Sequence, residues 1–337
     1  MAGTRTGAPP TLPTIPSRCH GVSLSIAGVE VKPGTRGKGY LRVSEASTHE
    51  VRVPWVAFNG FFPGPTLCVL GGVHSLECTP IEGLMRIIEE LDPSTLMGRL
   101  IIIPVVNTTG FEARAPYDNP WDHLNQNRIW PGDSDGPLTR RVAHAVWTEF
   151  LSKADAVVDA HSADLGEDAT RSVFVFKTDD ETLQSKMLEM AGCWDIDYIE
   201  TASVAGNTGE VVPRLRIPCV MTEAGAPYPI REKDAWWFAK GIYNLMRHLG
   251  ISPGDPIVRT VPVDPESSRL YATHGGVWRK LVDIGGKVKE GQLLGFVYSL
   301  VGDNLQEVKA PYYGTVTFLR THFSVNEGDT LLWLTRI

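Results

Sequence analysis

The sequence predicts an α/β domain, with a mixed or largely parallel sheet flanked by helices, and a small all-β domain after it. From about residue 64, apolar runs of strand length alternate with longer stretches whose apolar residues recur every three or four positions. The runs are apolar on both faces, as expected of strands covered by helices. After Ser252 the chain changes into short Val-, Leu-, Phe- and Tyr-rich runs separated by glycine pairs, which is typical of tight hairpins.

The individual elements follow from these two patterns. The runs at 66–73, 99–107, 155–161, 172–177 and 217–225 are short and rich in Val, Ile and Leu, and we expect them to be strands. The stretches at 79–92, 137–153, 180–192 and 231–250 have helical spacing. Residues 107–136 are dense in Asn, Asp, Gly and Pro and show no period. Loops of this length are usually functional or disordered, and the tryptophans in this one predict an ordered loop.

The chain divides into three predicted segments. Residues 1–20 are rich in Thr and Pro and lack the apolar core of a secretory signal, so we interpret them as a flexible leader; a transit peptide stays a weaker alternative. Residues 21–255 form the predicted main domain. A Pro-rich connector then leads into residues 256–337, the predicted β-rich domain.

Composition narrows the class of partner. The formal net charge of -7 argues against a nucleic-acid or anionic-membrane binder, which leaves a small molecule as the expected ligand. The five cysteines are widely spaced and form no C-x-x-C pair, which favours a reducing compartment; we expect a cytoplasmic protein. No run approaches the ~18 apolar residues of a membrane-spanning helix. A homo-oligomer stays open, since dimers are the commonest assembly.

Polar side chains follow three of the predicted strands. His74 and Glu77 lie between the first strand and its helix, His161 ends the run AVVDAH, and Glu223 ends IPCVMTE. Residues at the carboxyl ends of strands in an open α/β sheet meet in one crevice. Two histidines and a carboxylate are a ligand set of catalytic zinc sites, and Asp159 is placed to orient an imidazole. A further carboxylate, Glu223, could move protons between water and a leaving amine.

The long loop adds positive charge. It contains Arg114, Arg128 and, beside the latter, Asn127. Guanidinium groups suit the recognition of carboxylates and the charge of a tetrahedral intermediate. Tyr228, shortly after Glu223, is a further candidate for contact with a substrate.

Together these residues resemble the succinylglutamate desuccinylase and aspartoacylase family, a branch of the zinc carboxypeptidase-like fold. The resemblance rests on the order of G-G-x-H-x-x-E, N-R-x-x-P-G, D-x-H and T-E-x-G, runs from about residue 65 to 245, and extends to a tail that resembles the small barrel of this family. Ser75 and Leu76 depart from the usual pattern before the metal-binding glutamate. The acyl group and the amine are therefore left open.

The resemblance implies a role for each matching residue. Residues 21–255 become a zinc-hydrolase catalytic domain and residues 256–337 a barrel-sandwich-like domain. One Zn²⁺ per chain is implied, with hydrolysis of the amide bond of a small N-acylated amino acid or a related carboxylate-bearing amide. The implied roles are metal binding by His74, Glu77 and His161, catalysis by Glu223 as general base and acid, polarisation of the scissile carbonyl by Arg114, and binding of a substrate carboxylate by Asn127 and Arg128.

The residues themselves leave alternatives to this hydrolase open. Cys78 could be the nucleophile of a cysteine hydrolase if a histidine lowered the pKa of its thiol. The same fold could also be a binding protein without catalysis. The tail resembles biotinyl and lipoyl carrier domains, but the segment YSLVGDNLQEV contains no lysine where a carrier hairpin would display one, and Lys309 lies beyond it. We therefore expect the tail to pack against the catalytic domain, where it shapes the site or an oligomer interface.

Overall fold

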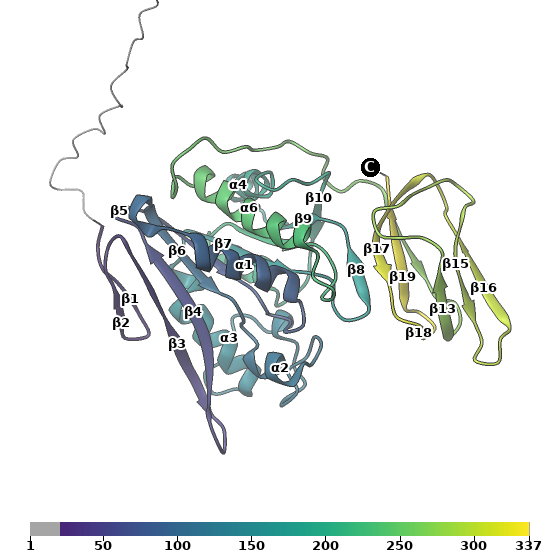
Figure 1. Ribbon diagram of the computed structural model, residues 1–337, viewed down its shortest axis with the longest axis horizontal. Coiled ribbons are helices and arrows are strands. Elements are labelled where there is room, and N and C mark those ends of the chain that lie inside the picture. Colours follow the sequence, from purple (N-terminus) through teal and green to yellow (C-terminus); the bar gives the residue numbers. More distant parts are fainter. Residues whose placement is uncertain (1–20, 337) are drawn as a thin grey trace, which may run out of the picture.

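The predicted fold class is confirmed. The computed structural model describes residues 21–336 and consists of a large mixed sheet between helices, followed by an all-β region (Figure 1). The leader predicted for residues 1–20 lies outside the described residues. Because β12 begins at Ser267, the tail sheets start after the Pro-rich connector, while the domain boundary near residue 256 stays a prediction.

The main sheet has eight strands. Its centre is parallel, because β5 pairs in parallel with β6 and β7, and β7 pairs in parallel with β11. Antiparallel pairing of β9 with β11 and of β4 with β3 and β6 makes the sheet mixed. The strand order is β10 (Ile199–Ala202), β9 (Ser172–Phe176), β11 (Cys219–Glu223), β7 (Ala156–His161), β5 (Phe62–Leu70), β6 (Met97–Ile103), β4 (Glu50–Asn59) and β3 (Thr35–Glu45). A separate ribbon pairs β1 (Leu24–Ile26) with β2 (Val29–Val31).

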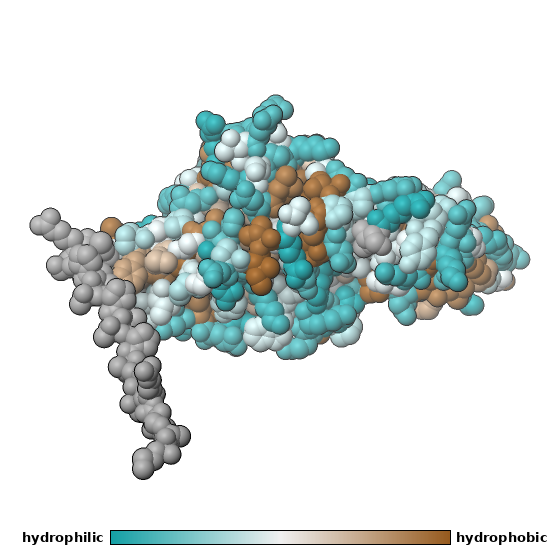
Figure 2. Space-filling view, turned by 90° about the horizontal axis from the view of Figure 1, so that it is seen from above, coloured by the Kyte–Doolittle hydropathy of each residue, from teal (hydrophilic) through white to brown (hydrophobic). Residues whose placement is uncertain are grey.

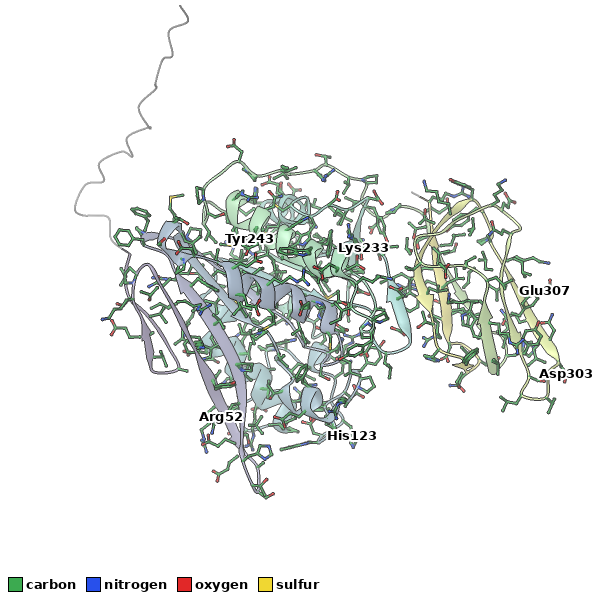
Figure 3. All side chains as sticks on the ribbon, viewed as in Figure 1. Arg52, His123, Lys233, Tyr243, Asp303 and Glu307 are labelled. Atoms are coloured by element: carbon green, nitrogen blue, oxygen red, sulfur yellow. The ribbon has the colours of Figure 1, made fainter. Side chains whose placement is uncertain are left out.

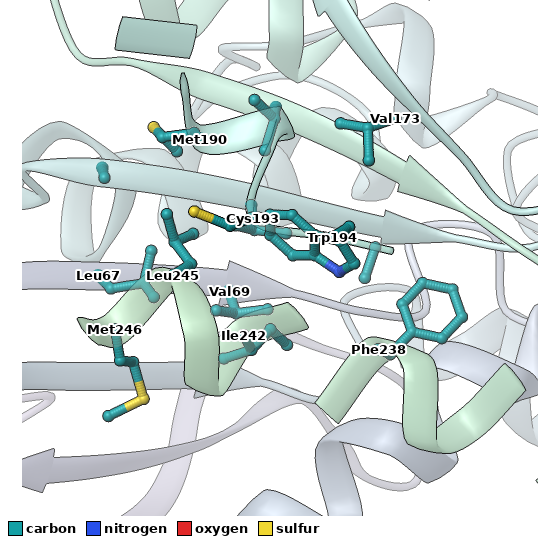
Figure 4. Packing of buried hydrophobic residues seen from close by; sticks show 14 of the residues in the cluster. Leu67, Val69, Val173, Met190, Cys193, Trp194, Phe238, Ile242, Leu245 and Met246 are labelled. Atoms are coloured by element: carbon teal, nitrogen blue, oxygen red, sulfur yellow. The ribbon is translucent and has the colours of Figure 1, made fainter. Parts of the chain in front are cut away.

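Helices cover both faces of this sheet. In β5, Leu67 and Val69 belong to one hydrophobic cluster while Cys68 and Leu70 belong to another, because successive side chains of a strand point to opposite faces. The first cluster receives α1 (Cys78–Glu90), α4 (Glu181–Ala191) and α6 (Glu232–His248); Figure 4 shows Trp194 and Phe238 within it. The second receives α3 (Leu138–Glu149) and α5 (Thr208–Val211). Two buried faces explain the continuous apolar runs of the sequence.

The structure differs from the predicted elements in several places, and it contains elements that were not predicted, including the short strands β1, β2, β8 (Glu167–Ala169) and β10 and the helix α5. The first predicted strand begins at Phe62 and ends at Leu70, because the chain turns at the following glycines, where Gly72 has φ +57°. The long antiparallel strands β3 and β4 were not predicted. The long loop contains a short helix, α2 (Thr108–Ala113), and four 3-10 turns occur along the main domain, at Pro93–Thr95, Gln126–Arg128, Leu151–Lys153 and Val212–Leu215.

The tail consists of two sheets. One contains β12 (Ser267–Tyr271), β19 (Thr330–Thr335), β17 (Gly314–Arg320) and β14 (Lys287–Val288), and β17 also pairs with β8 (Glu167–Ala169) of the main domain. The other contains β16 (Asn304–Lys309), β15 (Leu293–Tyr298), β13 (Gly276–Lys280) and β18 (Ser324–Val325). Between them lies a third hydrophobic cluster of tail residues.

The hairpin between β15 and β16 lies at the end of the tail that is remote from the main domain, as the positions of Asp303 and Glu307 show (Figure 3). Its turn carries Leu300 and Val301, each 88% exposed, where a carrier domain would display a lysine. Lys309, at the end of β16, pairs with Glu307 at 2.8 Å. The turn therefore carries apolar side chains in place of a carrier lysine, and the role of the tail as a packing domain stays a prediction.

Among residues 21–336, every helix is too short or too polar to cross a membrane. The face seen from above is mostly hydrophilic, with separate apolar patches over the main domain (Figure 2).

Candidate functional site

The ends of three neighbouring strands bring the predicted site residues to one edge of the sheet. His161 ends β7, Glu223 ends β11, and these two residues are paired directly across the parallel ladder. His74 lies in the turn after β5, and Glu77 is the residue before the first turn of α1. The carboxyl ends of parallel strands thus supply all four side chains, as the spacing in the sequence predicted.

Three of these side chains converge on a common point. His74 Nδ1 lies 2.7 Å from Glu77 Oε1, and His161 Nδ1 lies 2.7 Å from Glu77 Oε2. The two imidazole rings are 5.1 Å apart, and one ligand atom from each of the three residues lies within 4.8 Å of the others. All three side chains are buried. The structure therefore places two imidazoles and one carboxylate where a single metal ion could contact them all.

The outer nitrogens of the two imidazoles also face acceptors. His74 Nε2 is 3.1 Å from Asn125 Oδ1. His161 Nε2 is 3.1 Å from Asp159 Oδ1, close enough for an ion pair although the angles do not make a hydrogen bond. Asp159 is fully buried and accepts a hydrogen bond from the Thr208 hydroxyl through its other oxygen. Both nitrogens of each ring thus face oxygen acceptors in this structure. A cation at Nδ1 would displace the proton there, and the acceptors at Nε2 would keep the other proton in place, so both imidazoles fit a divalent metal.

The charges of this cluster are strongly coupled. Burial by itself raises the pKa of Glu77, but the two imidazoles outweigh it and lower this pKa to about 2. Burial by itself lowers the pKa of His161. The charges of Asp159 and Glu77 outweigh burial and raise this pKa well above its usual value. In this arrangement Glu77 is an anion held between two groups that favour its charge.

Glu223 lies at the same site. It is half-buried and lines a cavity of about 160 Å³ together with His74, Glu77 and His161. Burial raises the pKa of Glu223 to about 8, with repulsion from Glu77 adding to the increase and His161 partly opposing it. A carboxyl group with a pKa this close to neutrality can both accept and release a proton.

The predicted substrate residues divide into two groups. Asn127 and Arg128 line the cavity, and the Arg128 guanidinium donates to the Asn127 carbonyl at 2.7 Å. Asn127 Oδ1 is buried without a hydrogen-bond partner among the described residues. Arg114 and Tyr228 are both exposed and, in the described chain, neither lines this cavity. A hydrogen bond with Cys78 raises the pKa of the Tyr228 hydroxyl, and the charge of nearby Arg114 partly opposes this increase.

Comparison with known proteins identifies the family. Residues 63–249 match the family model of the succinylglutamate desuccinylase/aspartoacylase catalytic domain. The chain belongs to this family. The resemblance inferred from the four sequence motifs is thereby confirmed.

Relatives of this family are similar over most of their length. The chain is 28% identical over 281 residues to the N-alpha-acetyl-L-2,4-diaminobutyric acid deacetylase of Halomonas elongata, covering 80% of this chain and 81% of that protein. The product-bound ectoine utilization protein EutE (DoeB) from Ruegeria pomeroyi has a TM-score of 0.82 at 23% identity, over 95% of this chain and 100% of that chain. A succinylglutamate desuccinylase/aspartoacylase from Rhodobacter sphaeroides has a TM-score of 0.79 at 24% identity, over 89% and 95%. The two structures share the fold.

The family motifs do not point to several further residues of the site, including four with polar or charged side chains. Asn125 contacts His74, while Tyr117, Asp164 and Glu167 line the cavity. Asn125 lies just before the N-R motif and Asp164 follows His161 by three residues, so closeness in sequence to a motif was a usable signal for these two. Tyr117 is placed by the fold of the long loop, and Glu167 by the pairing of β8 with the tail strand β17. No local sequence pattern predicts either position.

Cys78 has the environment of a packed thiol. Burial raises the pKa of the Cys78 thiol, and its sulfur lies 3.1 Å from the Tyr228 hydroxyl. Within the described chain, Cys78 is absent from the residues that line the cavity. A nucleophilic thiol needs a lowered pKa and a base within reach, so this geometry disfavours the cysteine mechanism.

Proposed function

We propose that this chain is a metal-dependent amidohydrolase that removes the acyl group from a small N-acylated amino acid or a related carboxylate-bearing amide. The observation that carries the proposal is the convergence of His74, Glu77 and His161 beside Glu223 in one cavity. Membership of a family of deacylases, and the similarity to a deacetylase of an acetylated diamino acid, support the same reaction class.

His74, Glu77 and His161 would hold one zinc ion per chain. Two imidazole nitrogens and a carboxylate are a known ligand set of catalytic zinc, which leaves a coordination position open. When bound, zinc supplies the Lewis acidity that makes water nucleophilic near neutral pH. The second contacts of the imidazoles, to Asn125 and Asp159, support this assignment because they fix the tautomer and the ring orientation.

Glu223 would carry the proton during hydrolysis. It takes a proton from the attacking water and returns it to the departing amine, which leaves as a neutral group. The raised pKa of Glu223, about 8, arises partly from the charge of Glu77. A cation held by Glu77 would offset this repulsion and favour the carboxylate form that the first step requires.

The substrate carboxylate would bind beside Arg128 and Asn127. Arg128 supplies a guanidinium at the cavity. The side-chain carbonyl of Asn127 is buried and has no partner within residues 21–336, so it could accept from an N–H of the substrate. Arg114 and Tyr228 would join this set only if the loop carrying Arg114 moves toward the cavity when substrate binds. Arg114 would then stabilise the developing oxyanion.

Metal content tests the first part of the proposal. Elemental analysis of the purified protein should give about one zinc per chain, lost in His161→Ala and kept in the matched control His274→Ala, whose side chain lies in the tail. Absence of metal from zinc-supplied wild type, or its retention in His161→Ala, would contradict the assignment.

Turnover of a panel of N-acyl amino acids tests the second part. The panel should include Nα-acetyl-2,4-diaminobutyrate, the substrate named for the Halomonas relative, together with acetyl and succinyl amino acids. Glu223→Gln should keep the metal while lowering kcat at least ~100-fold, the scale of a lost general base. Undiminished turnover in a metal-loaded Glu223→Gln would reject its role as proton carrier.

A further inference from the structure

One segment belongs to both the site and the tail. Residues 162–171, here called the bridging segment, follow His161 directly and contain β8. β8 pairs with β17 of the tail, with Glu167 opposite Arg320, and the Thr321 N–H donates to the Gly166 carbonyl at 2.7 Å. Figure 1 shows β8 lying between the main domain and β17. The tail sheet thus continues into the wall of the proposed hydrolytic site.

A side-chain contact crosses the same junction. Arg320 Nη2 lies 3.3 Å from Glu167 Oε1, and both side chains are mostly buried, at 16% and 12% exposure. The other carboxylate oxygen of Glu167 accepts a hydrogen bond from the Tyr117 hydroxyl at 2.8 Å. Glu167 therefore links a cation of the tail to an aromatic residue of the long loop.

Tyr117 in turn packs against the candidate metal ligand. Its ring meets the His74 ring edge to face at a centroid distance of 5.3 Å, and its backbone N–H donates to Asp164 Oδ2 at 3.0 Å. The backbone of Tyr117 has φ +49°, a left-handed conformation that is costly for an aromatic residue and persists only where contacts hold it. The hydroxyl contact to Glu167 is one of the contacts that hold it.

We propose that Arg320 is a positioning residue for the hydrolytic site: acting through Glu167, it holds Tyr117 beside His74 and so shapes the wall of the substrate cavity. The kinetic part of this inference rests on the proposed function. Tyr117 and Glu167 both line the cavity, whereas Arg320 is absent from its described lining, so the tail acts on the site through this chain of contacts.

Substrate affinity is the property that should change. In Arg320→Met, Glu167 loses its cation and Tyr117 loses a fixed acceptor, so the cavity wall loosens while the metal ligands stay in place. We expect KM to rise about tenfold, the factor that corresponds to ~1.4 kcal/mol, with kcat within about threefold of wild type. Arg320→Lys keeps the charge and should restore most of the affinity.

Two further variants separate positioning from stability. Arg320 also donates to the Thr330 carbonyl at 2.7 Å and its Nη1 lies 3.0 Å from His322 Nε2, so Arg320→Met removes two contacts within the tail as well. Glu167→Gln leaves both contacts intact and should still raise KM. Arg279→Met is the matched control, because Arg279 lies over the Tyr298 ring in the same tail and is exposed. Its KM should equal that of wild type.

A double-mutant cycle identifies the route of the effect. Tyr117→Phe removes the hydroxyl that Glu167 accepts. If Arg320 acts through Tyr117, adding Tyr117→Phe to Arg320→Met should raise KM little beyond the larger single effect. Effects that multiply, or a normal KM in both Arg320→Met and Glu167→Gln, would overturn the inference.

Hydrogen exchange tests the contact chain without any turnover. Amide exchange of peptides covering 115–119 should speed up in Arg320→Met and Glu167→Gln, and stay unchanged in Arg279→Met. Faster exchange confined to the tail would overturn the inference even in a fully active enzyme. A wild type that hydrolyses no member of the panel would reject the proposed function instead, and the exchange result would still decide the role of Arg320.

Discussion

Gly166, in the bridging segment, should tolerate an added side chain poorly. Its φ is +79°, where an alanine costs about 1 kcal/mol. A Cβ built at Gly166 would lie 2.0 Å from His322 Cδ2 and 3.0 Å from His322 Cβ, so turning the imidazole aside does not remove the whole clash. Overpacking of this kind costs about 1–3 kcal/mol. Gly166→Ala should therefore lower the free energy of unfolding by about 2–4 kcal/mol, measured by urea unfolding.

A second background separates the two contributions. In His322→Gly the clashing atoms are gone, so Gly166→Ala should there cost only the ~1 kcal/mol of the backbone conformation. An equal cost of Gly166→Ala in both backgrounds would refute the steric reasoning. A cost below about 0.5 kcal/mol in the wild-type background would refute both terms.

Three further predictions concern the core, a helix end and the thiol. A Cβ at Gly241 would lie 1.9 Å from Nε1 of the buried Trp194, so Gly241→Ala should lose about 1–3 kcal/mol in urea unfolding, whereas Gly275→Ala, with no atom nearer than 3.6 Å, should stay within ~0.5 kcal/mol. Hydrogen bonds from the first turn of α4 and a nearby arginine lower the pKa of Asp180. Asp180→Asn should therefore have a lower free energy of unfolding than wild type at pH 6, and this difference should vanish as the pH falls below about 4 through the folded pKa. A pH-independent difference would contradict this. Cys78→Ser should keep kcat/KM within about threefold in the same substrate assay, because burial raises the pKa of the Cys78 thiol; loss of turnover would revive the cysteine mechanism.

The candidate metal ligands could be predicted because their positions depend on local sequence rules. A buried parallel strand must be apolar on both faces, so a histidine or glutamate at its end stands out in the sequence. His161 and Glu223 end adjacent strands and are paired across the ladder, and His74 and Glu77 follow the strand beside them. Spacing along the chain therefore translated directly into closeness in space.

The rest of the site depends on contacts that no local pattern encodes. Tyr117 lies in a loop without hydrophobic period, in a backbone conformation that its residue type does not favour. Glu167 faces the cavity because β8 pairs with β17, about 150 positions later in the chain. Long-range pairing of this kind is set by the packing of the whole molecule, and so the strands β3 and β4, which pair only at the edge of the sheet, were missed as well.

In this fold the candidate metal ligands and the wall of the cavity belong to different parts of the chain. The candidate metal ligands sit on the rigid ends of central strands, buried between two helical layers, where a substitution disturbs the core. The wall that faces them is built from the loop residue Tyr117 and from Glu167, whose position is set by Arg320 of a separate all-β region. Changes in the tail can therefore move the wall while the ligands stay fixed. Such a separation allows the acyl group or the amine to change without loss of the hydrolytic chemistry, and it predicts that specificity changes among relatives with this tail act first on KM.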